Sequence, residues 1–241
     1  MLVAGRQRSC EYAPVPNRQG SLDRLSSWLR RTPPTGGHPV SRSAPVVLVG
    51  KRVTLRSMTE ADYDAWFEVR ESCRDWLIRW EPRPAGARAL AEDHASYTSR
   101  CAGRERERQL GYGFGFGIFL AGRFCGEITL SSIQRGPFQS AVIGYWIDRE
   151  MAGQGLMPES VVAVLEYAFG GLGLHRVEIN IVPTNGPSRR VVEKLGLREE
   201  GVAIKMLEID GTWEDHMRFA IVAEEWADRR DALRTAWLTP G

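Results

Sequence analysis

The sequence is poor in cysteine and histidine, and neither residue type is grouped. Its four cysteines include no CxxC pair, and its four histidines show no ligand spacing. This pattern argues against a zinc site and a disulfide scaffold, so we expect no bound metal and a reducing, cytoplasmic setting. No continuous apolar run is long enough for a signal peptide core or a membrane span, so we expect no membrane contact.

The first 45 residues differ in composition from the rest of the chain. They carry seven arginines against two acidic residues, with many prolines, glycines and serines. Such a segment buries little apolar surface, which predicts a disordered basic arm over residues 1–45 and a single domain over residues 46–241. An inert tail, a contact with RNA or an acidic partner, and a targeting presequence are all open interpretations of the arm. Subtracting the arm's net charge of +5 from the chain's +2 leaves −3 for the domain, which argues against DNA binding.

Hydrophobic periodicity predicts a mixed α/β fold. The expected order is a strand, a group of helices, three antiparallel strands, a helix, a strand, a helix, two strands and a last helix. The charged run Arg104–Arg108 is interpreted as a solvated loop between the helices and the strands. The expected strands cover 53–56, 111–118, 124–133, 141–148, 177–182, 203–209 and 213–222, and the expected helices 59–70, 73–80, 87–101, 157–169, 185–195 and 223–237.

The stretch from Gly144 to Glu159 predicts a strand that turns through glycines into a helix. At such a junction several amide N–H groups lack partners in the helix, and the helix dipole adds partial positive charge. Gly153 and Gly155 let the backbone curl, so the following amides can converge on phosphate oxygens. The pattern indicates a pyrophosphate cradle, or else an ordinary helix start, and for Glu159 the simplest interpretation is an exposed helix position.

A second motif follows about thirty residues later, where Asn185 and Ser188 open the next predicted helix. With it, the sequence resembles the GNAT superfamily of acetyl-CoA-dependent N-acetyltransferases, and within it the RimJ/RimL type that acetylates N-termini of ribosomal proteins. The resemblance covers roughly residues 50–222. The motifs that carry it are Gly-Tyr-Trp-Ile at 144–147, Gly-Gln-Gly-Leu-Met at 153–157, His-Arg-Val-Glu at 175–178, the pair Asn185 and Ser188, Glu-Lys-Leu-Gly-Leu at 193–197 and Gly-x-Trp-x-Asp at 211–215.

The resemblance implies one GNAT-type domain with a mixed, mostly antiparallel central sheet flanked by helices, and acetyl-CoA as co-substrate. Backbone groups at Trp146 and Ile147 would pair with the pantetheine arm, and an amide there could stabilise an oxyanion. The cofactor-binding residues that it implies are Trp146, Ile147, Gly153, Gln154, Gly155, Leu156, Met157, Asn185 and Ser188. Ala152 departs from the superfamily signature, but the cradle should still form because its amides belong to the backbone.

The sequence also departs from the family pattern at the general acid and the general base. The tyrosine that many members carry as acid is replaced by Val192, and a glutamate base found in others is replaced by Asn180. Ser188 is therefore the candidate acid, able to protonate the leaving thiolate.

The general base is open between several strand carboxylates. Glu127 and Glu178 are the candidates, with Glu208 also possible, and a solvated or ion-paired carboxylate is the alternative for each. An α-amine with a pKa of about 7.8 is neutral in roughly a tenth of molecules at pH 7, whereas a lysine near 10.4 is neutral in fewer than about one in a thousand. An N-terminal acceptor would need little more than a water-mediated base.

Trp76 and Trp80, four residues apart on an early helix, are substrate-binding candidates, with Trp66 as a third and core packing as the alternative. The expected function is transfer of the acetyl group to a primary amine by direct attack in a ternary complex, the amine being the N-terminal α-amine of a protein, such as a ribosomal protein. A small amine such as an aminoglycoside or polyamine is one alternative acceptor. A catalytically silent CoA-binding or ribosome-associated module is the other alternative, and the chain could act as a monomer or a homodimer.

Overall fold

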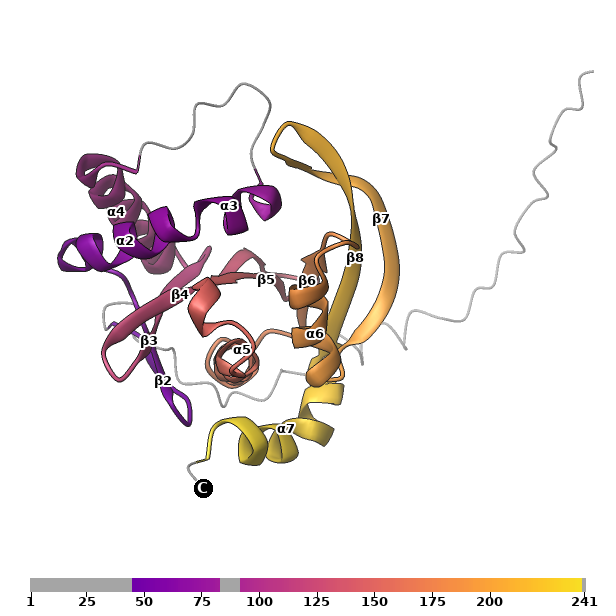
Figure 1. The fold of residues 1–241 in the computed structure, drawn as a ribbon. Coiled ribbons are helices and arrows are strands. Elements are labelled where there is room, and N and C mark those ends of the chain that lie inside the picture. The colour runs from indigo at the N-terminus through magenta and orange to yellow at the C-terminus, as the bar shows by residue number, and fades with distance from the viewer. Residues whose placement is uncertain (1–44, 83–91, 240–241) are drawn as a thin grey trace, which may run out of the picture. The chain divides into compact units, whose positions relative to one another are not determined.

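The computed structural model describes residues 45–82 and 92–239, so all but one residue of the predicted basic arm lie outside it. An eight-stranded sheet runs through the domain in the order β1-β2-β3-β4-β5-β6-β8-β7 (Figure 1). The strands are β1 Val47–Val49, β2 Val53–Arg56, β3 Phe114–Leu120, β4 Arg123–Gln134, β5 Ser140–Ile147, β6 Arg176–Ile181, β7 Arg198–Ile209 and β8 Thr212–Val222. All neighbours pair antiparallel except β5 and β6, which confirms the mixed, mostly antiparallel sheet.

The helices cover both faces of this sheet. In Figure 1, α2, α3 and α4 gather on one side, and α5 and α7 lie on the other. The helices are η1 Glu60–Asp62, α2 Tyr63–Ser72, α3 Arg74–Leu77, η2 Ile78–Trp80, α4 His94–Leu110, η3 Arg149–Met151, α5 Leu156–Glu166, η4 Tyr167–Gly171, α6 Gly186–Lys194 and α7 Ala223–Trp237. Every residue of α5 from Leu156 to Leu165 is buried, as expected of a helix enclosed by other elements.

The two parallel strands separate part of the way along their length. Their pairing starts at Ser140 with Arg176 and ends at Val142 with Glu178, although β5 continues to Ile147. The end of β5 pairs only with β4 on its other side. In the part of the chain that the structure describes, no strand pairs with one edge of residues 144–147, so its backbone groups are open, as the resemblance implies.

The predicted loop over Arg104–Arg108 is wrong, because α4 continues through it to Leu110 and ends at Gly111 with φ 75°. The charges repeat at helical spacing: Arg108 pairs with Glu105 of the same helix, and Arg104 with Glu127 of β4. Within this run, Arg104 and Arg108 therefore lie on the side of the helix that faces the sheet. Its predicted start near residue 87 lies outside the described residues.

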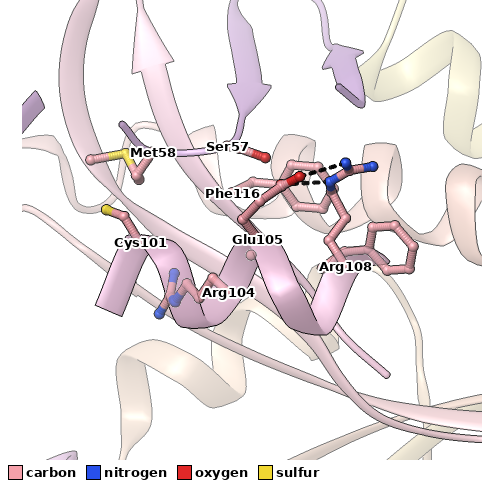
Figure 2. Close-up of a pocket in the computed structure, with 9 residues that line it drawn as sticks. Ser57, Met58, Cys101, Arg104, Glu105, Arg108 and Phe116 are labelled. Atoms are coloured by element: carbon pink, nitrogen blue, oxygen red, sulfur yellow. Dashed lines mark hydrogen bonds and ion pairs between the residues drawn. The ribbon is translucent and has the colours of Figure 1, made fainter. Parts of the chain in front are cut away.

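Glycines on β3 make room for these side chains. A Cβ at Gly115 would lie 2.9 Å from the Arg104 side chain, and one at Gly117 only 2.1 Å from the Met58 sulfur. Figure 2 shows Arg104 and its helical neighbours with Met58 around a small cavity of about 30 Å³ beside β3. At these glycines the face of the strand is bare backbone, which admits a closely packed helix.

Candidate active site

A cavity of about 930 Å³ lies where β5 and β6 separate. It is lined by every predicted cofactor-binding residue except Gln154, and also by Trp66, Trp76, Trp80 and Glu127. We call the part formed by residues 144–147, 151–158 and 185–194 the glycine half. The part formed by α2, α3, η2, α4, Glu81, Glu92 and Glu127 is the aromatic half. Glu178 and Glu208 are not among the lining residues.

The glycine half contains the turn into α5. Gly153 and Gly155 have φ of 81° and 82°, in the left-handed region that favours glycine. A Cβ at Gly153 would meet no atom within 4 Å, so glycine is needed there for its backbone conformation. Among the described residues, no side chain caps the start of α5 at Gly155, so the first amides of this helix have no side-chain acceptor there. Gly153, Gly155 and Leu156 line the cavity, and the anion cradle that they would form stays a prediction.

Asn185 and Ser188 also line the glycine half. The Oδ1 atom of Asn185 accepts a hydrogen bond of 3.1 Å from the Ser188 amide and caps α6, as predicted from the sequence. Because the oxygen is engaged, the Asn185 side chain has its amide nitrogen left to donate to a ligand.

Ser188 is also hydrogen-bonded to Tyr145, which is not among the site residues predicted from the sequence. The Ser188 hydroxyl donates to the Tyr145 hydroxyl at 3.0 Å, and the Tyr145 hydroxyl donates to the Ser188 carbonyl at 3.3 Å. Burial raises the pKa of Tyr145, with a smaller opposing effect of the Ser188 hydrogen bond. Both hydroxyls line the cavity, so Ser188 has a second hydroxyl within reach that can supply or accept a proton. The only signal in the sequence for a role of Tyr145 is its place in the 144–147 motif.

Glu127 lies in the aromatic half but is fully engaged. Its side chain is 2% exposed and accepts from Arg100 at 2.9 and 3.1 Å, with Arg104 at 2.9 Å. Burial raises its pKa, but Arg104 and Arg100 more than offset this and hold the pKa below its usual range. A carboxylate in this state accepts a proton poorly, so the structure favours the ion-paired alternative over a general base.

Glu178 is engaged in a similar way outside the cavity. Its carboxylate pairs with Arg176 and Arg218 at 2.8 Å each, and these partners hold its pKa below the usual range although burial raises it. The ion-paired alternative is favoured here too.

The rest of the aromatic half combines tryptophans with paired charges. Arg70 binds both Glu81 and Glu92, and Arg74 lies 3.2 Å from Glu92. The guanidinium of Arg100 lies 4.5 Å from the ring centre of Trp66, a cation–π contact. Every carboxylate among the described lining residues is therefore paired with at least one arginine.

The described residues lack two features that would indicate another class of site. Residues 45–82 and 92–239 contain no group of three or more His, Cys, Asp or Glu side chains that could hold a metal ion. Within the same ranges, no helix has both the length and the apolar composition needed to cross a membrane.

The fold and the site belong to a known class of transferase. Residues 52–198, more than half of the chain, match the family described as an acetyltransferase (GNAT) domain, so the chain belongs to this family. It is 46% identical to the Probable N-acetyltransferase YjcK of Bacillus subtilis (strain 168), over 42% of this chain and 55% of that protein. It is 34% identical to the [Ribosomal protein uS5]-alanine N-acetyltransferase of Escherichia coli (strain K12), over 44% of this chain and 54% of that protein. The chain thus spans about half the length of the curated relatives that it matches.

A solved structure is similar over a larger share of the chain. Mycobacterium smegmatis RimJ in complex with CoA-disulfide is 33% identical, with a TM-score of 0.74 over 83% of this chain and 96% of that one. This likeness covers most of the chain, and it confirms the resemblance to the RimJ/RimL type that the motifs indicate.

Proposed function

We propose that the protein is an acetyl-CoA-dependent N-acetyltransferase whose acceptor is the N-terminal α-amine of a protein, with ribosomal proteins as the candidate substrates and the cytoplasm as the setting. The observation that carries the proposal is the single cavity at the separation of β5 and β6, which joins the glycine turn and Ser188 to an aromatic wall. The relatives support it, since the uS5-alanine enzyme and RimJ are similar to this chain.

The glycine half fits acetyl-CoA in three places. The uncapped start of α5 offers amides to the pyrophosphate, and the open edge of residues 144–147 offers backbone groups to the pantetheine arm. Asn185 and Ser188 line the same cavity, where the thioester would stand. When bound, acetyl-CoA supplies an activated acetyl group that a neutral amine can attack directly.

Ser188 is the residue that we assign to the leaving thiolate. Its hydroxyl can turn from Tyr145 to the sulfur and donate a proton there, while the Tyr145 hydroxyl turns from the carbonyl of Ser188 to its Oγ. The hydrogen bond that the Tyr145 hydroxyl donates thereby changes from one of 3.3 Å, to the Ser188 carbonyl, to one of 3.0 Å, to Ser188 Oγ. Both hydroxyls keep a partner. The proton that the acceptor nitrogen loses then restores the Ser188 hydroxyl by way of water. We assign no carboxylate base, because Glu127 is held in ion pairs and roughly a tenth of an α-amine is already neutral at pH 7.

The charges of the aromatic half favour a peptide over a polyamine or an aminoglycoside. A polycation is held by several carboxylates that are free to accept from its ammonium groups. Here Glu81, Glu92 and Glu127 all have arginine partners, which a polycation would have to displace. A peptide N-terminus brings a single amine, and its first side chains can pack against the tryptophans.

Steady-state acetyl transfer tests this proposal against both alternatives. The assay compares peptides with different free N-termini against spermidine and an aminoglycoside, with acetyl-CoA as donor. We expect selective transfer to peptides. Uniform failure with peptides, with turnover of a small amine, would overturn the choice of acceptor. CoA binding without turnover of any amine would support the catalytically silent module instead.

A further inference from the structure

Glu159, in the first turn of α5, is buried, contrary to the simplest interpretation of the sequence. Its side chain is 1% exposed. One carboxylate oxygen accepts from the backbone amides of Arg52 and Val53, the latter at 2.9 Å, and the other accepts from Arg52 Nε at 3.0 Å. A buried carboxylate with this many charge-assisted bonds fixes the elements that it joins, here the turn between β1 and β2 and the start of α5.

The turn between β1 and β2 is shaped around this carboxylate. A Cβ at Gly50 would lie 2.6 Å from Glu159 Oε1, closer than such atoms come in proteins. Gly50 closes the turn by donating from its amide to the Val53 carbonyl at 2.8 Å. The backbone of the turn therefore lies close against the helix, and the Arg52 side chain adds a further contact with it.

Arg52 makes a second contact, with the loop that precedes α5. Its Nη1 donates to the Gln154 carbonyl at 3.0 Å, and its Nη2 lies 3.4 Å from the position that a Cβ of Gly155 would take. The peptide bond between these loop residues is trans, so the Gly155 N–H points away from the anchored carbonyl. Gly155 lines the large cavity. Because Arg52 holds the Gln154 carbonyl on the side away from the cavity, the Gly155 N–H is directed into the cavity.

We infer that Arg52 and Glu159 form a clamp that fixes the phosphate-binding loop, which makes Arg52 a positioning residue for the pyrophosphate of CoA. The inference rests on the proposed function. The loop needs such support because two left-handed glycines make it flexible when unbound, and because Ala152 has no side chain long enough to brace it. Arg52 is not among the cavity-lining residues, so it acts through the loop and not by contact with the ligand.

The clamp predicts an effect confined to the nucleotide end of the cofactor. For Arg52→Ala, we expect the Kd for CoA, measured by calorimetry, to rise about tenfold, the size expected for loss of one charge-assisted hydrogen bond. Transfer from S-acetylpantetheine, which has no pyrophosphate, should stay within about twofold of wild type, since a local loop effect leaves the thioester end intact. Arg52→Lys should lie between, because one ammonium cannot reproduce the forked contact with both Glu159 and Gln154.

Lys51→Ala is the matched control, since it removes the same charge from an exposed position in the same turn. We expect it to leave the Kd for CoA unchanged. An unchanged Kd in Arg52→Ala, an equal rise in Lys51→Ala, or an equal loss with both acetyl donors would overturn the clamp. If wild type itself fails to bind CoA, the proposed function fails and the clamp falls with it, whereas normal wild-type binding with an unaffected Arg52 variant overturns the clamp alone.

Discussion

The glycine half of the cavity offers mainly backbone, whereas the aromatic half offers mainly side chains. In the glycine half, the conformation of Gly153 and Gly155 and the open edge of β5 set where the amides point. In the aromatic half, the surface consists of tryptophan rings and of arginines paired with Glu81, Glu92 and Glu127. A backbone site tolerates side-chain changes as long as the chain keeps its path. A side-chain site changes with each residue, so acceptor choice should vary where cofactor choice does not.

The largest effect should come from breaking the charge cluster of the aromatic half. Glu127→Gln leaves Arg100 and Arg104 facing a neutral amide in a largely buried place, so we expect a loss of about 2 to 4 kcal/mol in the free energy of unfolding near neutral pH. Chemical denaturation measures it. Glu193→Gln, which removes an exposed ion pair with Arg189, should change stability by less than about 1 kcal/mol.

The same comparison should depend on pH in a defined direction. The pKa of Glu127 is lowered in the folded protein, so its contribution is present above the pKa of the unfolded carboxyl and is lost as the pH falls through the folded value. The unfolding free energies of wild type and Glu127→Gln should therefore converge in acid. A difference that stays constant as the pH falls would contradict the assignment of an ionised, paired carboxylate.

The next effect concerns the chemical step in the glycine half. Ser188→Ala should lower turnover about 100-fold, the usual size for loss of a general acid, with little change in the Kd for CoA. Tyr145→Phe should lower it by less, about tenfold, because it removes only the hydroxyl behind Ser188. Steady-state kinetics and calorimetry measure the two quantities. Equal rates for wild type and Ser188→Ala would remove Ser188 from the mechanism, and Ser131→Ala, outside the cavity lining, is the control.

Changing a tryptophan of the aromatic half should affect binding of the acceptor and not of acetyl-CoA. Trp76→Ala removes a half-buried ring from the cavity, so we expect the KM for a peptide acceptor to rise about tenfold while the KM for acetyl-CoA is unchanged. Trp213→Ala is the matched control, since this tryptophan is 54% exposed on β8 and does not line the cavity. A rise in both KM values would show that the two halves are not independent.

The smallest effect tests the backbone character of the glycine half. Gly153→Ala forces a non-glycine residue into the left-handed region at a cost of about 1 kcal/mol, which should weaken CoA binding about fivefold. Ala152→Gln changes a side chain next to it and should alter binding by less than about twofold, because the cradle uses amides. Calorimetry distinguishes the two. A gain in affinity from Ala152→Gln comparable to the loss from Gly153→Ala would contradict a site made of backbone.

The same division explains what the sequence reveals. The glycine turn and the Asn185 cap depend on neighbouring residues, so local patterns predict them and the structure confirms them. The hairpin turn at Asp210 and Gly211 also follows from local chemistry, with both residues at positive φ. The basic arm over residues 1–45 stays a prediction.

What the sequence does not reveal depends on contacts between distant segments. The burial of Glu159 requires a turn more than a hundred residues earlier in the chain. The helical state of the run Arg104–Arg108 depends on Glu127 across the sheet, since charge alternation alone fits a solvated loop equally well. Tyr145 likewise gains its role from Ser188, 43 residues later. Each case needs a tertiary partner that no local window contains.

Competition in one vessel tests the central claim most directly. A peptide with a free N-terminus and an internal lysine is mixed with an equal concentration of spermidine and with acetyl-CoA, and mass spectrometry identifies the acetylated nitrogens. The account predicts acetylation of the peptide α-amine, with the lysine and spermidine essentially untouched, because no lining carboxylate in the described part of the cavity is free to receive an ammonium group. Preferential acetylation of spermidine or of the lysine would contradict it.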